Sequence, residues 1–371
     1  MNNKIWLSSP HLTGEEQKYV KEAFDTNWVA PLGPNVNGLE EDICKYTGAK
    51  SCSALSSGTA AIHLSLIMLG VEKGDEVICS SFTFSATANP IRYQQAIPIF
   101  VDSESQTWNM SPELLEEAIV DRLSSGSKPK AIILVHLYGM PAKMEELMAI
   151  SEKYEIPVIE DAAEALGSKY RDQPMGTFSD YGIFSFNGNK IITTSGGGAL
   201  VSKNTEICKK ATFLATQARD QAPHYQHSEI GYNYRMSNII AGIGRGQMEV
   251  LDDRVISRRK NFEFYKKELS EFTDIHFVEE SEGFYANRWL TTILTDSFET
   301  REEIRLSLEK DNIESRPLWK PMHLQPVFKG FPVYSDGTSE DFFNRGLCLP
   351  SGSNLTTNEL NRVVSKLKST L

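Results

Sequence analysis

One lysine in the sequence stands where it could act as a nucleophilic amine. Lys190 follows the apolar, strand-like run Phe184–Phe186 and precedes three glycines, Gly196–Gly198. Most lysines are solvated surface charges, and for Lys190 taken alone that interpretation remains open. Its apolar and glycine flanks favour an ammonium partly removed from water. Because desolvation lowers the pKa of a lysine, such an amine can form a Schiff base with a carbonyl compound.

A second candidate group is the carboxylate of Asp161, which ends the run Val158–Asp161. The run begins with β-branched apolar residues, which predicts a buried strand. Asp161 could be a helix cap or one member of a structural ion pair. It could instead face a buried cationic nitrogen, because ligands bind at the carboxyl ends of parallel strands.

A third candidate is the segment Ser56–Ala61, which joins a predicted strand to a predicted helix and consists of small residues. Small residues let backbone N–H groups approach an anion, and the helix dipole favours a phosphate at this end. By itself the segment could also be an ordinary strand-to-helix turn. It matches neither the Walker pattern nor G-x-G-x-x-G, which argues against NTP hydrolysis and a standard dinucleotide site.

Together the three segments are more specific than each is alone. A phosphate-binding turn, a carboxylate at a strand end and a later lysine are the groups needed to hold pyridoxal phosphate (PLP). The turn would anchor the phosphate, Asp161 would keep the ring nitrogen protonated, and Lys190 would form an imine with the aldehyde. The sequence therefore predicts a PLP site with Lys190 and Asp161 as its catalytic residues.

Alternating strands and helices in the first two-thirds of the chain would position these groups. Short β-branched runs predict strands at Ser51–Ser56, Glu76–Ser80, Ile97–Val101, Ala131–His136, Val158–Asp161, Tyr181–Phe186 and Gly198–Ser202. Amphipathic runs predict helices between them, at Thr59–Leu69, Ser85–Tyr93, Pro112–Leu123 and Ala142–Tyr154. This alternation is typical of an α/β fold, in which helices cover both faces of a mostly parallel sheet.

The last third of the chain has a different pattern. A helical stretch over about residues 237–270 changes from small apolar residues to charged ones, and we expect it to bridge two lobes. Two strands and two helices are predicted beyond it, at Ile275–Val278, Trp289–Leu294, Arg301–Asp311 and Asn358–Leu367. We therefore expect a large α/β domain over residues 1–250 and a smaller α+β domain over residues 251–371.

Composition and charge exclude several classes of protein. Of the 371 residues, 40% are apolar and 23% are charged, as in globular proteins rather than disordered chains. The formal net charge of -11 argues against nonspecific nucleic-acid binding. No run resembles a membrane helix or a signal-peptide core, so we expect a cytoplasmic protein without a membrane partner. The five cysteines are scattered, which favours free thiols over disulfides or a zinc site.

The chain as a whole resembles the DegT/DnrJ/EryC1/StrS family of sugar aminotransferases. The matching motifs extend over nearly its full length, at Trp28–Pro34, Ser56–Ala61, Ser81–Asn89, Glu160–Glu164, Phe184–Lys190, Gly231–Met236 and Arg316–His323. The resemblance implies the fold-type I architecture of aspartate aminotransferase, with a large, mostly parallel sheet domain and a smaller C-terminal α+β domain. Within the family the chain is most similar to exopolysaccharide and bacillosamine-type members. Those enzymes aminate a UDP-linked 4-keto-6-deoxy-N-acetylhexosamine, and we expect L-glutamate as the amino donor.

The resemblance also implies roles for residues around the cofactor. Lys190 would carry PLP and move protons, Asp161 would pair with the ring nitrogen, and Glu164 would lie near the phenolic oxygen. Contacts to the phosphate are implied for Gly58, Thr59 and Ser185, and Phe84 would stack on the ring.

Roles on the substrate side follow in the same way. Asn233 would reach the phosphate in a neighbouring subunit, so the resemblance implies a homodimer with shared active sites. The approach for the nucleotide-sugar substrate would be formed by Trp28, Ala30, Gly33, Arg316, Trp319, Lys320 and His323.

The chain departs from the family pattern at three places. Asn187–Gly188 replace a frequent His-Pro, Ser195–Gly197 replace Gly-Glu-Gly, and Glu164 stands where other members have Gln or His. The first two departures concern details near the substrate, and the third concerns the cofactor's phenolic oxygen. None removes the lysine.

The sequence argues against two other functions and against a metal site. A sugar dehydratase of the same family carries His in place of the lysine, so Lys190 argues against that activity. A non-catalytic sensor with the same fold would be expected to lose Lys190 or Asp161, and both are present. The loop residues His224, His227 and Glu229 lack a fourth ligand and helical spacing, so we expect no metal site.

Overall fold

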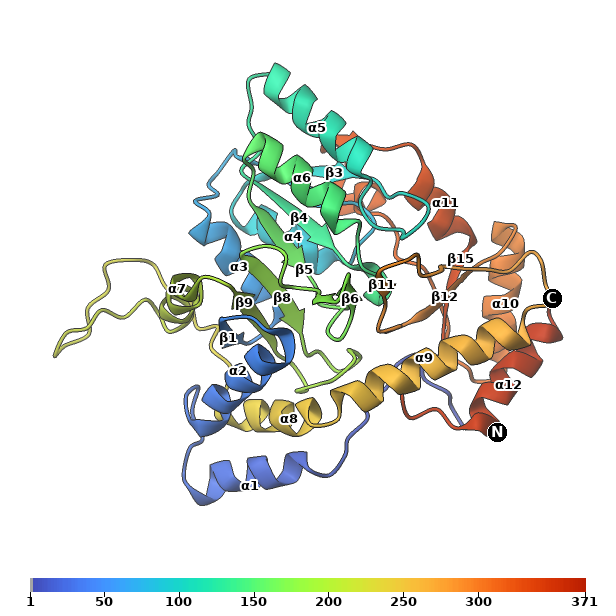
Figure 1. Cartoon of the computed structure of the whole chain (residues 1–371), viewed down its shortest axis with the longest axis horizontal. Coiled ribbons are helices and arrows are strands. Elements are labelled where there is room, and N and C mark those ends of the chain that lie inside the picture. Colours follow the sequence, from blue (N-terminus) through green and yellow to red (C-terminus); the bar gives the residue numbers. More distant parts are fainter. Residues whose placement is uncertain (1–2) are drawn as a thin grey trace.

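The computed structural model describes residues 3–371. Its main sheet has eight strands in the order β1-β9-β8-β5-β4-β2-β3-β14 (Figure 1). In that order the strands span Ser51–Leu55, Gly198–Ser202, Tyr181–Ser185, Val158–Asp161, Ala131–Val135, Glu76–Ser80, Ile97–Val101 and Val333–Tyr334. Neighbours from β8 to β14 pair in parallel, whereas β9 runs antiparallel to both β1 and β8. The predicted α/β fold with a mostly parallel sheet is confirmed.

Helices cover both faces of this sheet. One face carries α3 (Gly58–Met68), α4 (Ser85–Tyr93) and α7 (Thr205–Ala215). The opposite face carries α2 (Pro34–Thr47), α5 (Pro112–Ser124), α6 (Met144–Tyr154) and α8 (Asn238–Met248), with α1 (Glu16–Asp25) packed on α8. Successive side chains of a strand point to opposite faces, so Ile132 and Ile133 of β4 belong to different cores. Because both faces are covered, strands such as β4, with the sequence AIILV, are apolar throughout.

A second, antiparallel sheet lies beside the first. Its strands, in the order β10-β12-β15-β13, span His276–Phe277, Thr291–Leu294, Gly346–Leu349 and Arg316–Pro317. Its helices are α10 (Phe298–Lys310), α11 (Thr338–Arg345) and α12 (Thr357–Lys368). Buried Ile5, near the start of the chain, pairs with Ile313 and adds to this core. Among residues 3–371 no helix is both long and apolar enough to cross a membrane.

The stretch expected to form one helix over about residues 237–270 contains two. α8 ends at Met248 and α9 (Leu251–Glu268) begins three residues later. Between them, Val250 lies outside the helical region at φ -121°. Glu249 at the break is held by α1, because its carboxylate accepts from the Tyr19 hydroxyl at 2.6 Å. The two helices also bury different surfaces: α8 packs on α1 and α2, and α9 contacts α12. Figure 1 shows α9 extending from α8 toward the second sheet.

Two small strand pairings link the C-terminal third of the chain to earlier segments. The hairpin β6 (Lys169–Tyr170) and β7 (Gln173–Pro174) is joined by β11 (Phe284–Tyr285), which comes from the C-terminal third. β14 pairs with β3 at the edge of the main sheet, so part of the C-terminal third lies in that sheet. The division into domains at residue 250 stays a prediction.

Candidate active site

A cavity of about 360 Å³ lies at the carboxyl ends of β1, β4, β5 and β8. This is where a parallel sheet is expected to bind a ligand, and the volume is within the usual range for small-molecule sites. The residues predicted for the site that line the cavity are Gly58, Thr59, Phe84, Asp161, Glu164, Ser185, Lys190 and Trp319. These residues come from five separate segments of the chain, which the fold brings together.

The N-terminus of α3 forms one end of the cavity. Ser57 caps the helix, and its hydroxyl accepts from the Ala60 N–H at 3.0 Å. The first N–H groups of a helix have no partner within it, which leaves those of Gly58 and Thr59 for a ligand. A Cβ at Gly58 would lie 3.3 Å from the Cβ of Ser185, so glycine permits the close approach of that serine. Backbone N–H groups and two hydroxyls therefore meet in a place suited to a phosphate.

Asp161 lies at the end of β5 and is 5% exposed. The Thr87 hydroxyl donates to its Oδ2 at 2.8 Å, and the Ala163 N–H donates to its Oδ1 at 3.2 Å. Burial raises the pKa of this carboxyl, while the two hydrogen bonds and the positive charge of Lys190 oppose the rise. A cationic ligand nitrogen at Asp161 would compensate for the missing water.

Lys190 faces a second buried carboxylate. Its Nζ lies 3.3 Å from Oε1 of Glu164 and 4.0 Å from the centre of the Trp289 ring. The other oxygen of Glu164 accepts from the Tyr138 N–H at 2.7 Å. Burial raises the pKa of Glu164, and the Lys190 charge opposes that rise. One ammonium thus lies between a carboxylate and an aromatic face.

The peptide before Lys190 is held by residues that the sequence did not single out. The carbonyl oxygen of Asn189 accepts from the Trp289 indole N–H at 2.7 Å and from the Ser8 hydroxyl at 2.6 Å. Arg258, fully buried on α9, donates to the Trp289 carbonyl and to the Ser8 hydroxyl. No local pattern marks these residues, because each contact joins segments far apart in the sequence.

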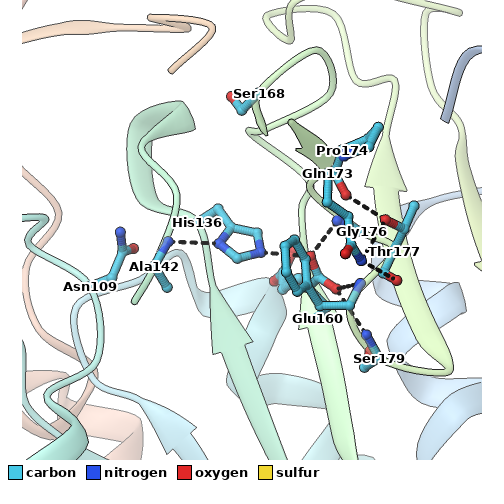
Figure 2. Close-up of polar contacts among 12 residues, drawn as sticks. Asn109, His136, Ala142, Glu160, Ser168, Gln173, Pro174, Gly176, Thr177 and Ser179 are labelled. Atoms are coloured by element: carbon cyan, nitrogen blue, oxygen red, sulfur yellow. Dashed lines mark hydrogen bonds and ion pairs between the residues drawn. The ribbon is translucent and has the colours of Figure 1, made fainter. Parts of the chain in front are cut away.

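A buried polar network fixes the strand that carries Asp161. Figure 2 shows Glu160 between His136 and the loop that follows β7. His136 Nδ1 accepts from the Ala142 N–H at 3.1 Å, so its Nε2 carries the proton donated to Glu160 at 3.0 Å. Glu160 also accepts from the N–H groups of Gly176, Phe178 and Ser179. Since both side chains are fully buried, the end of β5 has little freedom to move.

Several predicted residues do not line the cavity of this single chain: Trp28, Ala30, Gly33, Asn233, Arg316, Lys320 and His323. Arg316 is 62% exposed and forms an ion pair with Glu314 at 2.8 Å. His323 lies between the Ser81 hydroxyl, at 2.6 Å, and the Glu340 carboxylate, at 3.2 Å. Asn233 is exposed, and its backbone forms a bridge with Thr216. Their proposed roles toward substrate and partner stay predictions.

Comparison with known proteins agrees with this geometry. Residues 10–368 match the model of the DegT/DnrJ/EryC1/StrS aminotransferase family. The chain belongs to this family. It is 54% identical, over 99% of its length and 96% of the relative's, to EpsN of Bacillus subtilis, named as a pyridoxal phosphate-dependent aminotransferase. It is 38% identical to a protein of Escherichia coli O157:H7 named GDP-perosamine synthase, over 96% of this chain and 95% of that protein.

A solved structure extends the agreement to the fold. The chain superposes on a sugar aminotransferase of Streptococcus pneumoniae, in its PLP form, with a TM-score of 0.92 and 28% identity, covering 99% of this chain and 98% of that one. The protein is therefore a PLP-dependent sugar aminotransferase of fold-type I. Its cavity fits PLP chemically, because it combines an anion-binding helix end, a buried carboxylate and one lysine. Within residues 3–371 no second lysine lines this cavity.

Proposed function

We propose that this aminotransferase moves an amino group from L-glutamate to a nucleotide-linked 4-keto-6-deoxy sugar, in the biosynthesis of a bacterial polysaccharide or glycan. The observation that carries the proposal is the convergence of Lys190, Asp161 and the α3 N-terminus in one cavity. Bound PLP supplies an aldehyde that accepts the amine and a ring that withdraws electrons from the reacting carbon.

Each of these groups has a distinct task in the proposed reaction. The N–H groups of Gly58 and Thr59 and the hydroxyl of Ser185 would hold the phosphate. Asp161, buried at the end of β5, would pair with the ring nitrogen and keep a proton on it. Lys190 Nζ would bind the aldehyde and, once displaced by the donor amine, take and return the proton of the reacting carbon. Glu164, 3.3 Å away, would hold the ammonium form of Lys190 in place.

Replacing Lys190 tests this assignment directly. Purified Lys190→Ala should bind PLP without the covalent link that borohydride reduction fixes in the parent protein. Its amino transfer should fall at least about a thousandfold, because the group that moves the proton is lost. Lys169→Ala is a matched control, since that lysine is exposed and outside the cavity. Transfer at near-normal rate by Lys190→Ala would disprove the assignment.

Two candidates for the nucleotide of the substrate have support. We infer a UDP-linked N-acetyl sugar from the resemblance to bacillosamine-type members, whereas relatives named GDP-perosamine synthases support a GDP-linked sugar. Incubation with glutamate and matched UDP- and GDP-linked 4-keto-6-deoxy sugars, analysed by mass spectrometry, decides between them. Conversion of the UDP-N-acetyl sugar alone would support our first candidate, and conversion of the GDP sugar alone would replace it.

We also propose that two copies of the chain complete each active site. Asn233 does not line the cavity of its own chain, and it is exposed in the segment that follows the loop at residues 219–229. In a homodimer this residue would meet the phosphate bound by the other subunit, as the family resemblance implies.

A further inference from the structure

Tyr138 has an unusual backbone conformation for an aromatic residue. It lies in the short turn Leu137–Gly139, with φ 54° and ψ 16°, in the left-handed region. Bulky residues seldom adopt this conformation, and where one does, the surrounding structure must stabilise it. Here the backbone N–H donates to Oε2 of Glu164 at 2.7 Å, and Oε1 of the same carboxylate contacts Lys190.

The side chain of Tyr138 points away from this contact into the core between the two sheets. The residue is 4% exposed and packs in a cluster that includes Phe82, Trp289 and Cys348. Its phenolic oxygen accepts from the backbone N–H of Trp319 at 2.8 Å. Tyr138 therefore contacts Glu164, the partner of Lys190, through its backbone, and it contacts the backbone of Trp319 through its side chain.

Trp319 forms an aromatic wall of the cavity. Its ring lies 6.0 Å from that of Phe84 and 6.4 Å from that of Trp289, and all three residues line the cavity. Its ring also lies 5.6 Å from that of Tyr138. The indole N–H of Trp319 has no hydrogen-bond acceptor among residues 3–371. A buried donor without an acceptor at a cavity wall is suited to a polar atom of a ligand.

We propose that Tyr138 is a positioning residue for the sugar substrate. It fixes the Trp319 segment relative to the Glu164–Lys190 pair, so that the aromatic wall and the reacting amine keep a constant separation. This inference rests on the proposed function and on the place at the nucleotide-sugar approach that the family resemblance implies for Trp319. The phenol of Tyr138 contacts only the Trp319 side of the cavity. The contact with Glu164 uses the backbone N–H, which every substitution except proline retains.

Hydrogen exchange tests the structural part without substrate. In Tyr138→Phe, the amide of Trp319 loses its acceptor, and the peptide that contains it should exchange faster than in the parent protein. The peptide that contains Lys190 should be unchanged. Tyr265→Phe is a matched control, since its buried hydroxyl donates to the Pro350 carbonyl at 2.9 Å, outside the cavity. Unchanged exchange at Trp319, or equal acceleration in the control, would overturn the proposal.

Kinetics tests the functional part. With PLP bound, Tyr138→Phe should react with glutamate alone within about twofold of the parent rate, because Glu164 and Lys190 keep their contacts. The KM for the nucleotide sugar should rise about three- to tenfold, the effect of one lost hydrogen bond, while kcat changes less. Equal losses in both half-reactions, or an unchanged KM for the sugar, would contradict the positioning role. Failure of the parent enzyme to aminate any nucleotide sugar would contradict the proposed function instead, and the exchange experiment would still decide the structural part.

Discussion

Two buried carboxylates and one ammonium share the active site, and their charges do not balance. Asp161 and Glu164 both have raised pKa values because burial disfavours their ionised forms, and Lys190 opposes the rise at each. A cationic ligand nitrogen at Asp161 would add a second positive charge beside the two buried carboxylates and would favour their ionised forms.

The first prediction at this scale concerns the charge of Asp161. Asp161→Asn keeps an acceptor for the Thr87 hydroxyl but cannot hold a proton on the ring nitrogen. We expect turnover to fall by about a hundredfold or more, as when a charge-stabilising group is removed from an active site. The free energy of unfolding should fall by no more than about 1 kcal/mol. Steady-state kinetics and urea unfolding, measured on the same preparation, check both; near-normal turnover would refute the role.

The second prediction concerns Glu164 and pH in the cofactor-free protein. Because its folded pKa is raised above the ordinary 4.5, the proton binds the folded form more tightly. This proton therefore contributes to the free energy of unfolding below pH 4.5, the pKa of an ordinary glutamate. The contribution is lost as the pH rises through the raised pKa of the folded protein. The free energy of unfolding should therefore decline with pH more steeply in the parent than in Glu164→Gln. Urea unfolding over a pH series that begins below 4.5 measures the two slopes; parallel slopes would argue against this titration.

At the residue scale, the groups that can be predicted from sequence are those whose chemistry shows in a short local pattern. Lys190, Asp161 and the Ser56–Ala61 turn could be selected because each stands in a short pattern with a physical meaning. Trp289 and Arg258 could not, because their importance comes from contacts with the distant Asn189 and Ser8. The role of Tyr138 could not be predicted for another reason. Its backbone is left-handed, and only a glycine or asparagine at that position would have indicated this conformation in the sequence.

At the scale of elements, β5 depends on the carboxylate beside Asp161. Glu160 accepts from three backbone N–H groups and from His136, all within the buried network of Figure 2. Glu160→Ala should lower the free energy of unfolding by about 3–5 kcal/mol, because these donors lose their acceptor in the interior. It should also weaken PLP binding, since Asp161 is the next residue. Glu206→Ala, which removes an exposed carboxylate paired with Lys209, is the control and should change stability little.

The strands of the main sheet could be predicted closely because burial leaves a strong pattern. The seven strands predicted for the main sheet agree with the structure within one residue at each end, as in β4, where the predicted end His136 follows the observed end Val135. β14 could not be predicted, because two residues are too few to show a period. The break between α8 and α9 could not be predicted, because neither Glu249 nor Val250 is a helix-breaking residue such as proline or glycine.

At the scale of the whole molecule, an active site shared between two subunits predicts that two inactive variants can complement each other in a mixed dimer. Lys190→Ala lacks the reacting amine, and Asn233→Asp would repel the phosphate in the neighbouring subunit. If the enzyme is a homodimer with shared sites, mixing the two inactive variants and refolding them together should restore activity in roughly one site in four. Refolding each variant alone is the control. No recovery in mixed dimers, verified by size and mass, would show that Asn233 serves its own chain or none.

The pairing of β14 with β3 has a consequence for how substrates enter. After β13 the chain leaves the second sheet, joins the edge of the first through β14, and returns through α11 to β15. Asp102, next to β3, accepts from the backbone N–H groups of Gly337 and Ser339 and reinforces this connection. Swinging one sheet against the other would break these bonds, so hinge opening about a single linker is not available to this fold. The β14 segment therefore acts as a second tie between the sheets, and the two walls of the cavity that they carry should keep their relative orientation when a substrate binds.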